Sequence, residues 1–220
     1  MLKSTIIKTN DGSDSLYVPE LDEHYHSVYG AVQEAMHVYI NNGFNFSDIS
    51  PISILEIGFG TGLNAFLTYL ESKKTNRIVK YTSVELYPVA SDIVEQLNYP
   101  EFINNEEKEF FYNLHKADWN CENRINDSFI LNKINQDLLL YQPNEYFDLI
   151  YFDAFAPDKQ PELWSVEVFR KLYNHLNENG ILTTYSAKGI VKRALREVGF
   201  KVKRLPGPPG KWEMLRSQKV

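Results

Sequence analysis

Cysteine is nearly absent from this sequence, as are long apolar runs and internal repeats. The single cysteine, Cys121, excludes an internal disulfide framework and any zinc site built from several cysteines. No apolar run approaches the roughly 20 residues that a membrane-spanning helix needs, and the start of the chain lacks the continuous apolar stretch of a signal peptide. These absences predict a cytoplasmic protein without a membrane partner. A length of 220 residues allows one well-buried domain.

Charge is distributed unevenly along the chain. The net charge is −6, but residues 188–220 contain ten Lys or Arg against two Glu, so this segment carries +8 and residues 1–187 carry −14. A positive segment on an acidic body is typical of a surface that contacts phosphate groups. The alternative is a solvated helix face with edge strands protected by lysine.

Apolar runs of strand length alternate with segments of helical spacing from residue 51 onwards. This alternation predicts an α/β, Rossmann-like fold with a doubly wound, mostly parallel sheet. We expect residues 51–220 to form this domain and residues 1–50 to form an N-terminal extension that acts as a lid. The expected strands are 53–59, 78–86, 114–119, 147–155 and 181–187, with a terminal pair at 201–206 and 212–217, and the expected helices are 62–73, 91–98, 161–179 and 189–200.

A glycine-rich loop, "EIGFGTGLN", follows the first strand of this domain. Gly58, Gly60 and Gly62 allow the backbone to bend sharply and to approach a ligand closely. The spacing is G-x-G-x-G rather than the G-x-G-x-x-G of dinucleotide-binding folds. Glu56, just before the loop, would repel a pyrophosphate but suits an amino-acid ammonium.

An acid also closes each of the next three expected strands, namely Glu85, Asp118 and Asp153. Glu85 can accept hydrogen bonds from both hydroxyls of a ribose, and Asp118, with Trp119 beside it, can accept from an adenine amino group. Carboxylates around a glycine loop fit a cationic nucleoside, so we predict S-adenosylmethionine as the cofactor. The alternative, in which each acid caps its own turn, explains the acids singly but not as a series.

Several longer motifs carry a resemblance to a known family. They are "LDEHYHSVYGAVQEAMHVYI", "EIGFGTGLNAFLT", "DAFAPDKQPELW", "TYSAKGIVKRALREVGF" and "GPPGKWEMLR". Over about residues 21–216, the chain resembles the methyltransferase domain of the bacterial tRNA 5-methylaminomethyl-2-thiouridine biosynthesis enzymes, the MnmC type. Many members carry a FAD-dependent oxidase domain after this one, so a chain that stops at Val220 resembles the stand-alone form.

The resemblance implies that the N-terminal extension covers the methionine end of the cofactor, with Tyr25, Tyr29 and Glu34 as candidates. The complete set of expected cofactor-binding residues is Glu34, Glu56, Gly58, Gly60, Gly62, Asn64, Glu85, Asp118, Trp119 and Asp153.

The resemblance also implies a reaction: methylation of the exocyclic amine of 5-aminomethyl-2-thiouridine at the tRNA wobble position, giving 5-methylaminomethyl-2-thiouridine. An alkyl amine is largely protonated at neutral pH, so it must lose a proton before it attacks a methyl group. A neighbouring carboxylate can attract the ammonium and receive that proton. Asp153 ends the fourth strand at the switch point of the sheet, nearest the expected methyl position, and is the predicted catalytic residue.

Substrate contacts are expected from two groups of residues. An apolar wall of Phe155, Pro157 and Trp164 offers a flat surface for a base turned out of the anticodon loop. The expected tRNA contacts are Lys188, Lys192, Arg193, Arg196 and Lys211. The family commonly has arginine where this chain has Trp212, so a phosphate contact is not carried over to that position. The resemblance further implies a functional link to a separate FAD-dependent oxidase or to the enzymes that install the aminomethyl group.

Three alternatives to this hypothesis are a metal site, an aminopropyltransferase and a non-catalytic RNA-binding protein. His24 and His26 lie among acids, but no third His or Cys accompanies them and methyl transfer needs no metal, so no metal is predicted. An aminopropyltransferase of the spermidine synthase type uses the same fold and an amine nucleophile, but its polyamine groove does not suit a basic C-terminal segment. A non-catalytic RNA-binding relative would not need the intact glycine loop and its acids.

Overall fold

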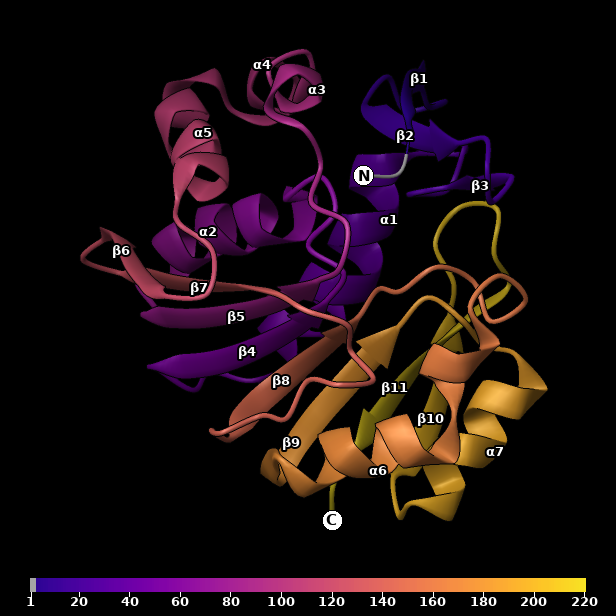
Figure 1. Cartoon of the computed structure of the whole chain (residues 1–220). Coiled ribbons are helices and arrows are strands. Elements are labelled where there is room, and N and C mark those ends of the chain that lie inside the picture. Colours follow the sequence, from indigo (N-terminus) through magenta and orange to yellow (C-terminus); the bar gives the residue numbers. More distant parts are fainter. Residues whose placement is uncertain (1–2) are drawn as a thin grey trace.

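An eight-stranded sheet forms the centre of the protein in the computed structural model, which describes residues 3–220 (Figure 1). The strand order is β10-β11-β9-β8-β4-β5-β7-β6. The strands from β9 to β7 in this order run parallel, whereas β6 and the β10–β11 pair are antiparallel additions at the two edges. The predicted doubly wound, mostly parallel α/β sheet is therefore confirmed. The strands are β4 Ile52–Ile57, β5 Val79–Glu85, β6 Glu122–Asn126, β7 Phe129–Asn135, β8 Phe147–Phe152, β9 Leu176–Thr184, β10 Lys201–Pro206 and β11 Glu213–Gln218.

Helices cover both faces of the sheet (Figure 1). One face packs against α1 (Ala31–Ala35), α2 (Leu63–Thr75) and α5 (Lys108–Lys116). The other face packs against α6 (Val166–Asn174) and α7 (Gly189–Glu197). Within residues 3–220, no helix has both the length and the apolar character to cross a membrane. The shorter helical segments are the π-helical turn Met36–Asn41, α3 Ser91–Val94, α4 Tyr99–Ile103 and the 3₁₀ turns Phe44–Phe46, Asn105–Glu107 and Pro161–Trp164.

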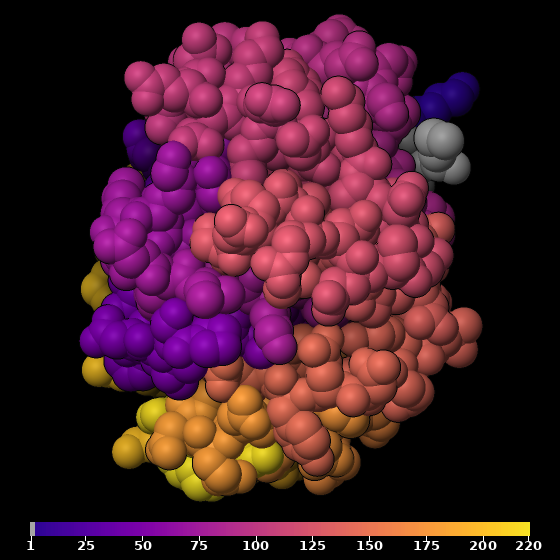
Figure 2. Space-filling view, turned by 90° about the vertical axis from the view of Figure 1, so that its left-hand side faces the viewer, coloured from indigo at the N-terminus to yellow at the C-terminus, as the bar shows by residue number. Residues whose placement is uncertain are grey.

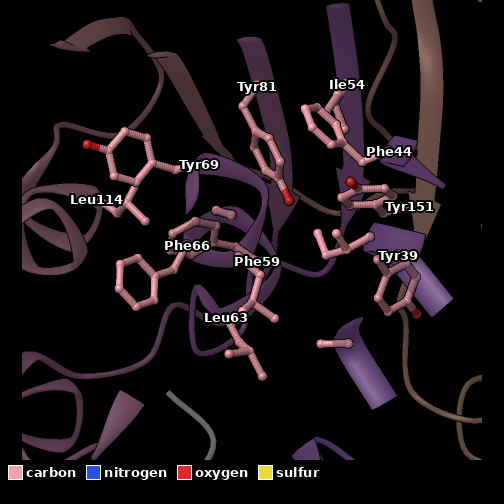
Figure 3. Packing of buried hydrophobic residues seen from close by; sticks show 14 of the residues in the cluster. Tyr39, Phe44, Ile54, Phe59, Leu63, Phe66, Tyr69, Tyr81, Leu114 and Tyr151 are labelled. Carbon is pink, nitrogen blue, oxygen red and sulfur yellow. The ribbon is translucent and has the colours of Figure 1, made fainter. Parts of the chain in front are cut away.

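Aromatic side chains fill the core on the α2 face of the sheet (Figure 3). Tyr81 of β5 and Tyr151 of β8 are fully buried there, and the ring of Tyr39 lies 5.2 Å from that of Tyr151, centroid to centroid. Val38 and Phe44 belong to the same cluster. Residues before position 50 thus share the core of the sheet, and the boundary between an extension and a domain stays a prediction.

A small antiparallel sheet precedes α1, in the order β1-β2-β3. Its strands are β1 (Thr5–Lys8), β2 (Asp14–Val18) and β3 (Glu23–His24). Figure 1 shows β3 on the same side of the molecule as the carboxyl ends of β8 and β9. The segment that follows β3 is therefore able to form one wall of a site at that edge.

The third parallel strand is not where the sequence pattern placed it. Leu114, expected in a strand over 114–119, lies in α5, where it is buried with Phe110 and Phe111 on one helical face. The third strand is β7, which pairs with β5 and forms a hairpin with β6. Seen from the β6 edge, residues of this hairpin lie across the middle of the surface (Figure 2). The prediction was wrong because residues 114–119 consist of the last three residues of α5 and the irregular segment that follows them, so Leu114 belongs to the buried face of a helix.

The expected helix over 161–179 is also shorter than its pattern suggested. The helix α6 ends at Asn174, and β9 begins at Leu176, which pairs with Phe147 of β8. Gly180 therefore lies inside a strand instead of ending a helix. At the start of α6, the Ser165 hydroxyl oxygen accepts a hydrogen bond from the backbone N–H of Val168 at 3.3 Å, a typical helix cap.

Candidate active site at the carboxyl edge of the sheet

A cavity of about 590 Å³ opens where the parallel strands end. The loops after β4, β5, β7 and β8 form its floor, and the segment from Glu23 to Tyr29 forms the opposite wall. Sheets of this type bind ligands in the crevice outside the carboxyl ends of their strands. The volume falls within the range of small-molecule and cofactor sites.

The glycine loop between β4 and α2 depends on backbone conformations that glycine favours. Gly58 has φ +89° and Gly60 has φ +50°. A Cβ atom on Gly58 would lie 2.8 Å from the carbonyl oxygen of Asp153, closer than packed atoms tolerate. Glycine at position 58 therefore allows the loop to pack directly on the end of β8, and both glycines line the cavity.

Glu85 lies at the end of β5 and fixes the glycine loop from the second strand. Its Oε2 accepts a hydrogen bond from the backbone N–H of Gly60 at 3.0 Å, and its Oε1 accepts one from Tyr87 at 2.8 Å. Burial raises the pKa of Glu85 above its ordinary value, and these backbone N–H groups oppose the shift. The carboxylate also lines the cavity. Its remaining lone pairs are available to hydroxyl donors such as a ribose diol.

Asp153 directly follows β8 and faces the cavity. Its Oδ1 accepts a 2.6 Å hydrogen bond from the Tyr39 hydroxyl, and its Oδ2 accepts a 2.8 Å hydrogen bond from the Asn64 side-chain amide. Burial raises the pKa of Asp153 to about 7, although both hydrogen bonds favour the charged form. A carboxyl group with this pKa can accept and release a proton near neutral pH.

Glu34 and Lys211 form an ion pair inside the same cavity. Glu34 Oε2 also accepts a 2.7 Å hydrogen bond from the backbone N–H of Ser27, and the Lys211 ammonium lies 3.9 Å from the ring centroid of Tyr185. Lys211 was expected to contact tRNA phosphate. The structure instead turns its side chain inward, where Glu34 and Tyr185 hold it.

The wall formed by the N-terminal segment rests on the loops of the main sheet. The Tyr25 ring meets the Phe155 ring edge-on, with 5.2 Å between centroids. A Cβ atom on Gly60 would lie 3.1 Å from the Tyr25 ring, so this ring covers the glycine loop. The segment thus forms one wall of the cavity, and its role as a lid stays a prediction.

The structure brings together six of the ten residues expected to bind the cofactor and two of the eight expected to contact the substrate. Those that line the cavity are Glu34, Gly58, Gly60, Asn64, Glu85, Asp153, Phe155 and Lys211.

Glu56 does not line the cavity, contrary to the expectation of a direct cofactor contact. Its side chain is fully buried behind the glycine loop, where Oε2 accepts a 2.8 Å hydrogen bond from the Ser83 hydroxyl. Burial raises the pKa of Glu56 well above its ordinary value, which favours its neutral form. The sequence does not distinguish a β4 side chain that points into the core from one that points into the cavity at the end of the strand. Gly62, the residue just before α2, likewise lies outside the cavity lining.

Asp118 and Trp119 also lie outside the cavity lining, because the strand they were expected to end does not exist. Asp118 is exposed after α5, and Trp119 pairs with Lys133 of β7 in an isolated bridge. The third strand instead brings Gln136 and Asp137 to the cavity. The sequence signal for these two was their position directly after the apolar alternation of β7.

Two of the three residues expected to form an apolar wall are core residues. Pro157 is buried away from the cavity, and Trp164 is only 4% exposed, with its indole N–H donating to the Phe155 carbonyl at 2.9 Å. Only Phe155 reaches the cavity. Trp164 therefore supports the loop that carries Phe155 instead of offering a surface to a base.

The remaining expected tRNA contacts lie on α7, outside the cavity. Arg193 and Arg196 are exposed and Lys192 is half-buried, and none of the three pairs with a carboxylate among residues 3–220. Lys188, just before the helix, pairs with Asp158. The three cations on α7 are thus available to an external anion.

The two histidines considered as metal ligands do not form a cluster with further ligands. Nδ1 of His26 lies 2.9 Å from the hydroxyl oxygen of Ser15, and burial lowers the pKa of this histidine to about 4. Within residues 3–220, no three His, Cys, Asp or Glu side chains are arranged to hold a metal ion.

Tyr39 and Tyr185 were not singled out from the sequence. Tyr39 belongs to the π-helical turn after α1, and Tyr185 follows β9, with its hydroxyl donating to the Ala154 carbonyl at 2.9 Å. Both support the segment around Asp153. Tyrosines are frequent in this chain, and nothing local distinguishes these two from the core tyrosines.

The fold and the cavity together define a class of protein. A doubly wound sheet, a G-x-G-x-G loop after its first strand and an acid at the end of the second are those of a Rossmann-like S-adenosylmethionine-dependent methyltransferase. Gly58 and Gly60 line the cavity without side chains, and Glu85 presents oxygen acceptors to it, so the residues present fit this cofactor.

Comparison with known proteins gives the family. Residues 99–220 match the family described as S-adenosyl-L-methionine-dependent methyltransferase. The chain is 30% identical to the tRNA 5-methylaminomethyl-2-thiouridine biosynthesis bifunctional protein MnmC of Burkholderia multivorans, across 98% of this chain and 35% of that protein. It superposes on the crystal structure of MnmC2 from Aquifex aeolicus with a TM-score of 0.83 and 24% identity, covering 99% of this chain and 70% of the other. Spermidine synthase from Thermotoga maritima shares the fold, with a TM-score of 0.55 and 14% identity over 100% of this chain and 72% of the other.

The chain therefore belongs to a family of S-adenosylmethionine-dependent methyltransferases, and its cofactor is S-adenosylmethionine. The resemblance to MnmC-type enzymes that its motifs indicated is confirmed. The chain spans about a third of the length of the curated relatives it matches.

Proposed function

We propose that this protein methylates the exocyclic amine of 5-aminomethyl-2-thiouridine at the wobble position of tRNA, and that Asp153 is the residue that prepares the amine. The single observation that carries the proposal is Asp153 itself. It is a cavity-facing carboxyl group, its pKa is raised to about 7, and Tyr39 and Asn64 hold it in place. The similarity to proteins named for the biosynthesis of this nucleoside supports the choice of substrate.

The cavity suits a positively charged amine. Apart from Lys211, its charged lining is acidic, with Glu23, Glu85, Asp137 and Asp153 among the carboxyl groups. The Lys211 ammonium is already paired with Glu34. An incoming alkylammonium therefore meets carboxylates that attract it, and Asp153 lies at the end of β8, beside the glycine loop.

Proton transfer follows from this arrangement. When bound, S-adenosylmethionine supplies an electrophilic methyl group whose leaving group is a neutral thioether. The ionised Asp153 would take a proton from the substrate ammonium, which leaves the amine nitrogen with the lone pair needed to accept that methyl group. The Tyr39 hydroxyl and the Asn64 amide keep the Asp153 carboxylate in one orientation, which supports in-line attack.

In this proposal, the basic surface of α7 contacts the rest of the tRNA. Lys192, Arg193 and Arg196 carry charge without a carboxylate partner among the described residues. Phosphate contacts of this kind position a nucleic acid without reading its sequence. Phe155 then offers an apolar edge in the cavity to the base that enters it.

The experiment is methylation of tRNA from cells that make the aminomethyl nucleoside but lack the methylating activity. Purified protein and S-adenosylmethionine are added, and the nucleosides are analysed by mass spectrometry. We expect 5-aminomethyl-2-thiouridine to disappear as its N-methyl product forms. A parallel reaction with a free diamine and decarboxylated S-adenosylmethionine tests the aminopropyl-transfer alternative. An unchanged tRNA profile would refute the proposal.

A further inference from the structure

Trp212 is 97% exposed, the highest value for a large apolar side chain among residues 3–220. Tryptophan is usually well buried, because its ring is the largest apolar surface that a side chain carries. The exposure does not come from a loose chain end, since Trp212 directly precedes β11. A ring presented to solvent from an ordered position calls for a ligand.

The loop that carries Trp212 is held at several points. The backbone N–H of Gly207 donates to the Trp212 carbonyl at 3.1 Å, and the N–H of Lys211 donates to the Pro208 carbonyl at 2.9 Å. On the following residue, the Glu213 carboxylate accepts a 3.1 Å hydrogen bond from Arg204. The backbone that carries the indole is therefore held in place before any ligand arrives, which lowers the entropic cost of ordering the loop on binding.

This loop also forms part of the cavity rim. Lys211 sends its side chain into the cavity, whereas Trp212, the next residue, points into solvent. A Cβ atom on Gly210 would overlap the Tyr29 ring, which lines the cavity and is itself 51% exposed. The indole thus belongs to a loop that lines the cavity through Gly210 and Lys211.

Trp212 lies in the basic segment of the chain. Residues 188–220, which contain it, carry a net charge of +8. The exposed lysines of β10, Lys201 and Lys203, lie beside Gln218 and Arg216, toward the end of β11 away from Trp212. An exposed flat ring in a positively charged segment fits an unpaired nucleobase with its phosphates, because bases stack on aromatic rings while Lys and Arg follow the backbone. A protein partner would instead favour a larger continuous apolar patch.

We propose that Trp212 is a stacking platform for an unpaired nucleobase that neighbours the nucleotide inserted in the cavity. The inference rests on the proposed function, because it needs a single-stranded RNA loop as substrate. It assigns a binding role to a residue outside the cavity. Base stacking is tolerant of sequence, so the platform adds affinity and orientation but no base identity.

The test compares Trp212→Ala with Trp212→Phe in the otherwise unchanged protein. The probe is an anticodon stem-loop RNA that carries 5-aminomethyl-2-thiouridine, and its affinity is measured by fluorescence anisotropy at several salt concentrations. We expect Trp212→Ala to weaken RNA binding by roughly 5- to 150-fold and Trp212→Phe to restore most of the affinity. The slope of log affinity against log salt should stay unchanged, because stacking releases no counterions. Methylation of the free nucleoside and affinity for S-adenosylmethionine should match wild type.

Tyr146→Ala is the matched control, because this side chain is 62% exposed and lies just before β8, at the opposite end of the strand from Asp153. It should leave RNA affinity unchanged. If wild type methylates the RNA and Trp212→Ala binds it equally well, the platform is overturned while the proposed function stands. If wild type neither binds nor methylates the RNA, both fail. A changed oligomeric state of Trp212→Ala with intact RNA affinity would assign the ring to a protein contact and overturn the inference.

Discussion

Tyr39 and Asp153 lie 114 residues apart in the chain and are joined by a 2.6 Å hydrogen bond from the tyrosine hydroxyl to Oδ1. The bond crosses from the helical segment after α1 to the end of β8. It stabilises the ionised form of a carboxyl group whose burial favours the neutral form. The pKa of Asp153 thus reflects a balance that a single hydroxyl group can shift.

Removing that hydroxyl should move the pH dependence of the reaction. In Tyr39→Phe, the charged form of Asp153 loses a hydrogen bond, so the pKa of Asp153 should rise above about 7. Because the ionised form accepts the proton, the midpoint of the rise in single-turnover rate with pH should move up by about one unit. Rates are measured from pH 5.5 to 9. Tyr69→Phe, whose hydroxyl bonds to Glu107, is the control and should keep the wild-type midpoint.

Glu85 and Glu56 offer a matched pair for testing which acid contacts the cofactor. Glu85 lines the cavity, whereas Glu56 is buried behind it with a pKa raised well above its ordinary value. Glu85→Gln should weaken S-adenosylmethionine binding by roughly tenfold or more, because hydrogen bonds to a carboxylate are stronger than those to an amide. Glu56→Gln changes a side chain that does not line the cavity, so this variant should bind the cofactor as wild type does. Titration calorimetry measures both, and a large loss in Glu56→Gln alone would reverse these assignments.

The sequence predicted the sheet, the glycine loop and Asp153 because each depends on local pattern. Buried parallel strands appear as short apolar runs, and a cavity-facing acid marks the end of two of them: Glu85 ends β5 and Asp153 directly follows β8. Asp118 was expected at the end of a strand because residues 114–119, which are the end of α5 and the segment after it, resemble a short strand in the sequence. Glu56 was misplaced because its direction depends on packing. Tyr39 could not be found, because only the fold brings the helix after α1 to β8.

The basic face of α7 should govern tRNA binding without touching the cofactor. Replacing Lys192, Arg193 and Arg196 by Ala removes three cations that lack a carboxylate partner among residues 3–220. We expect weaker tRNA binding and a salt dependence whose slope falls by about 0.7 to 0.9 per lost phosphate contact. Affinity is measured by filter binding across a salt series, alongside S-adenosylmethionine affinity, which should not change.

A control triple variant separates this surface from net charge. Lys74, Lys80 and Lys116 are exposed on the acidic part of the chain, and replacing them by Ala removes the same charge elsewhere. This variant should keep the wild-type slope. Equal losses in the two triple variants would mean that only overall charge matters and that α7 has no particular role.

Asp153→Asn separates a catalytic carboxylate from a residue that only supports its loop. The variant keeps the shape of the side chain but cannot accept a proton, so single-turnover methylation should fall by roughly two orders of magnitude or more. Cofactor affinity should change much less, because Glu85 and the glycine loop lie on other strands. If Asp153 only positions a neutral amine, raising the pH should restore much of the rate, whereas a proton acceptor gives weaker rescue.

Stability provides an independent measurement on the same variant. The pKa of Asp153 is raised from 3.8 to about 7 by folding, so between these values the folded protein binds a proton that the unfolded chain has released. The contribution of this group to stability is therefore fully present below about pH 4 and is lost as the pH rises through about 7. Asn has no such titration, so the melting temperature of Asp153→Asn relative to wild type should rise between pH 4 and pH 8. A turn-supporting acid with an ordinary pKa would give a pH-independent loss of about 1 kcal/mol with near-normal chemistry, and that pair of results would eliminate the catalytic role.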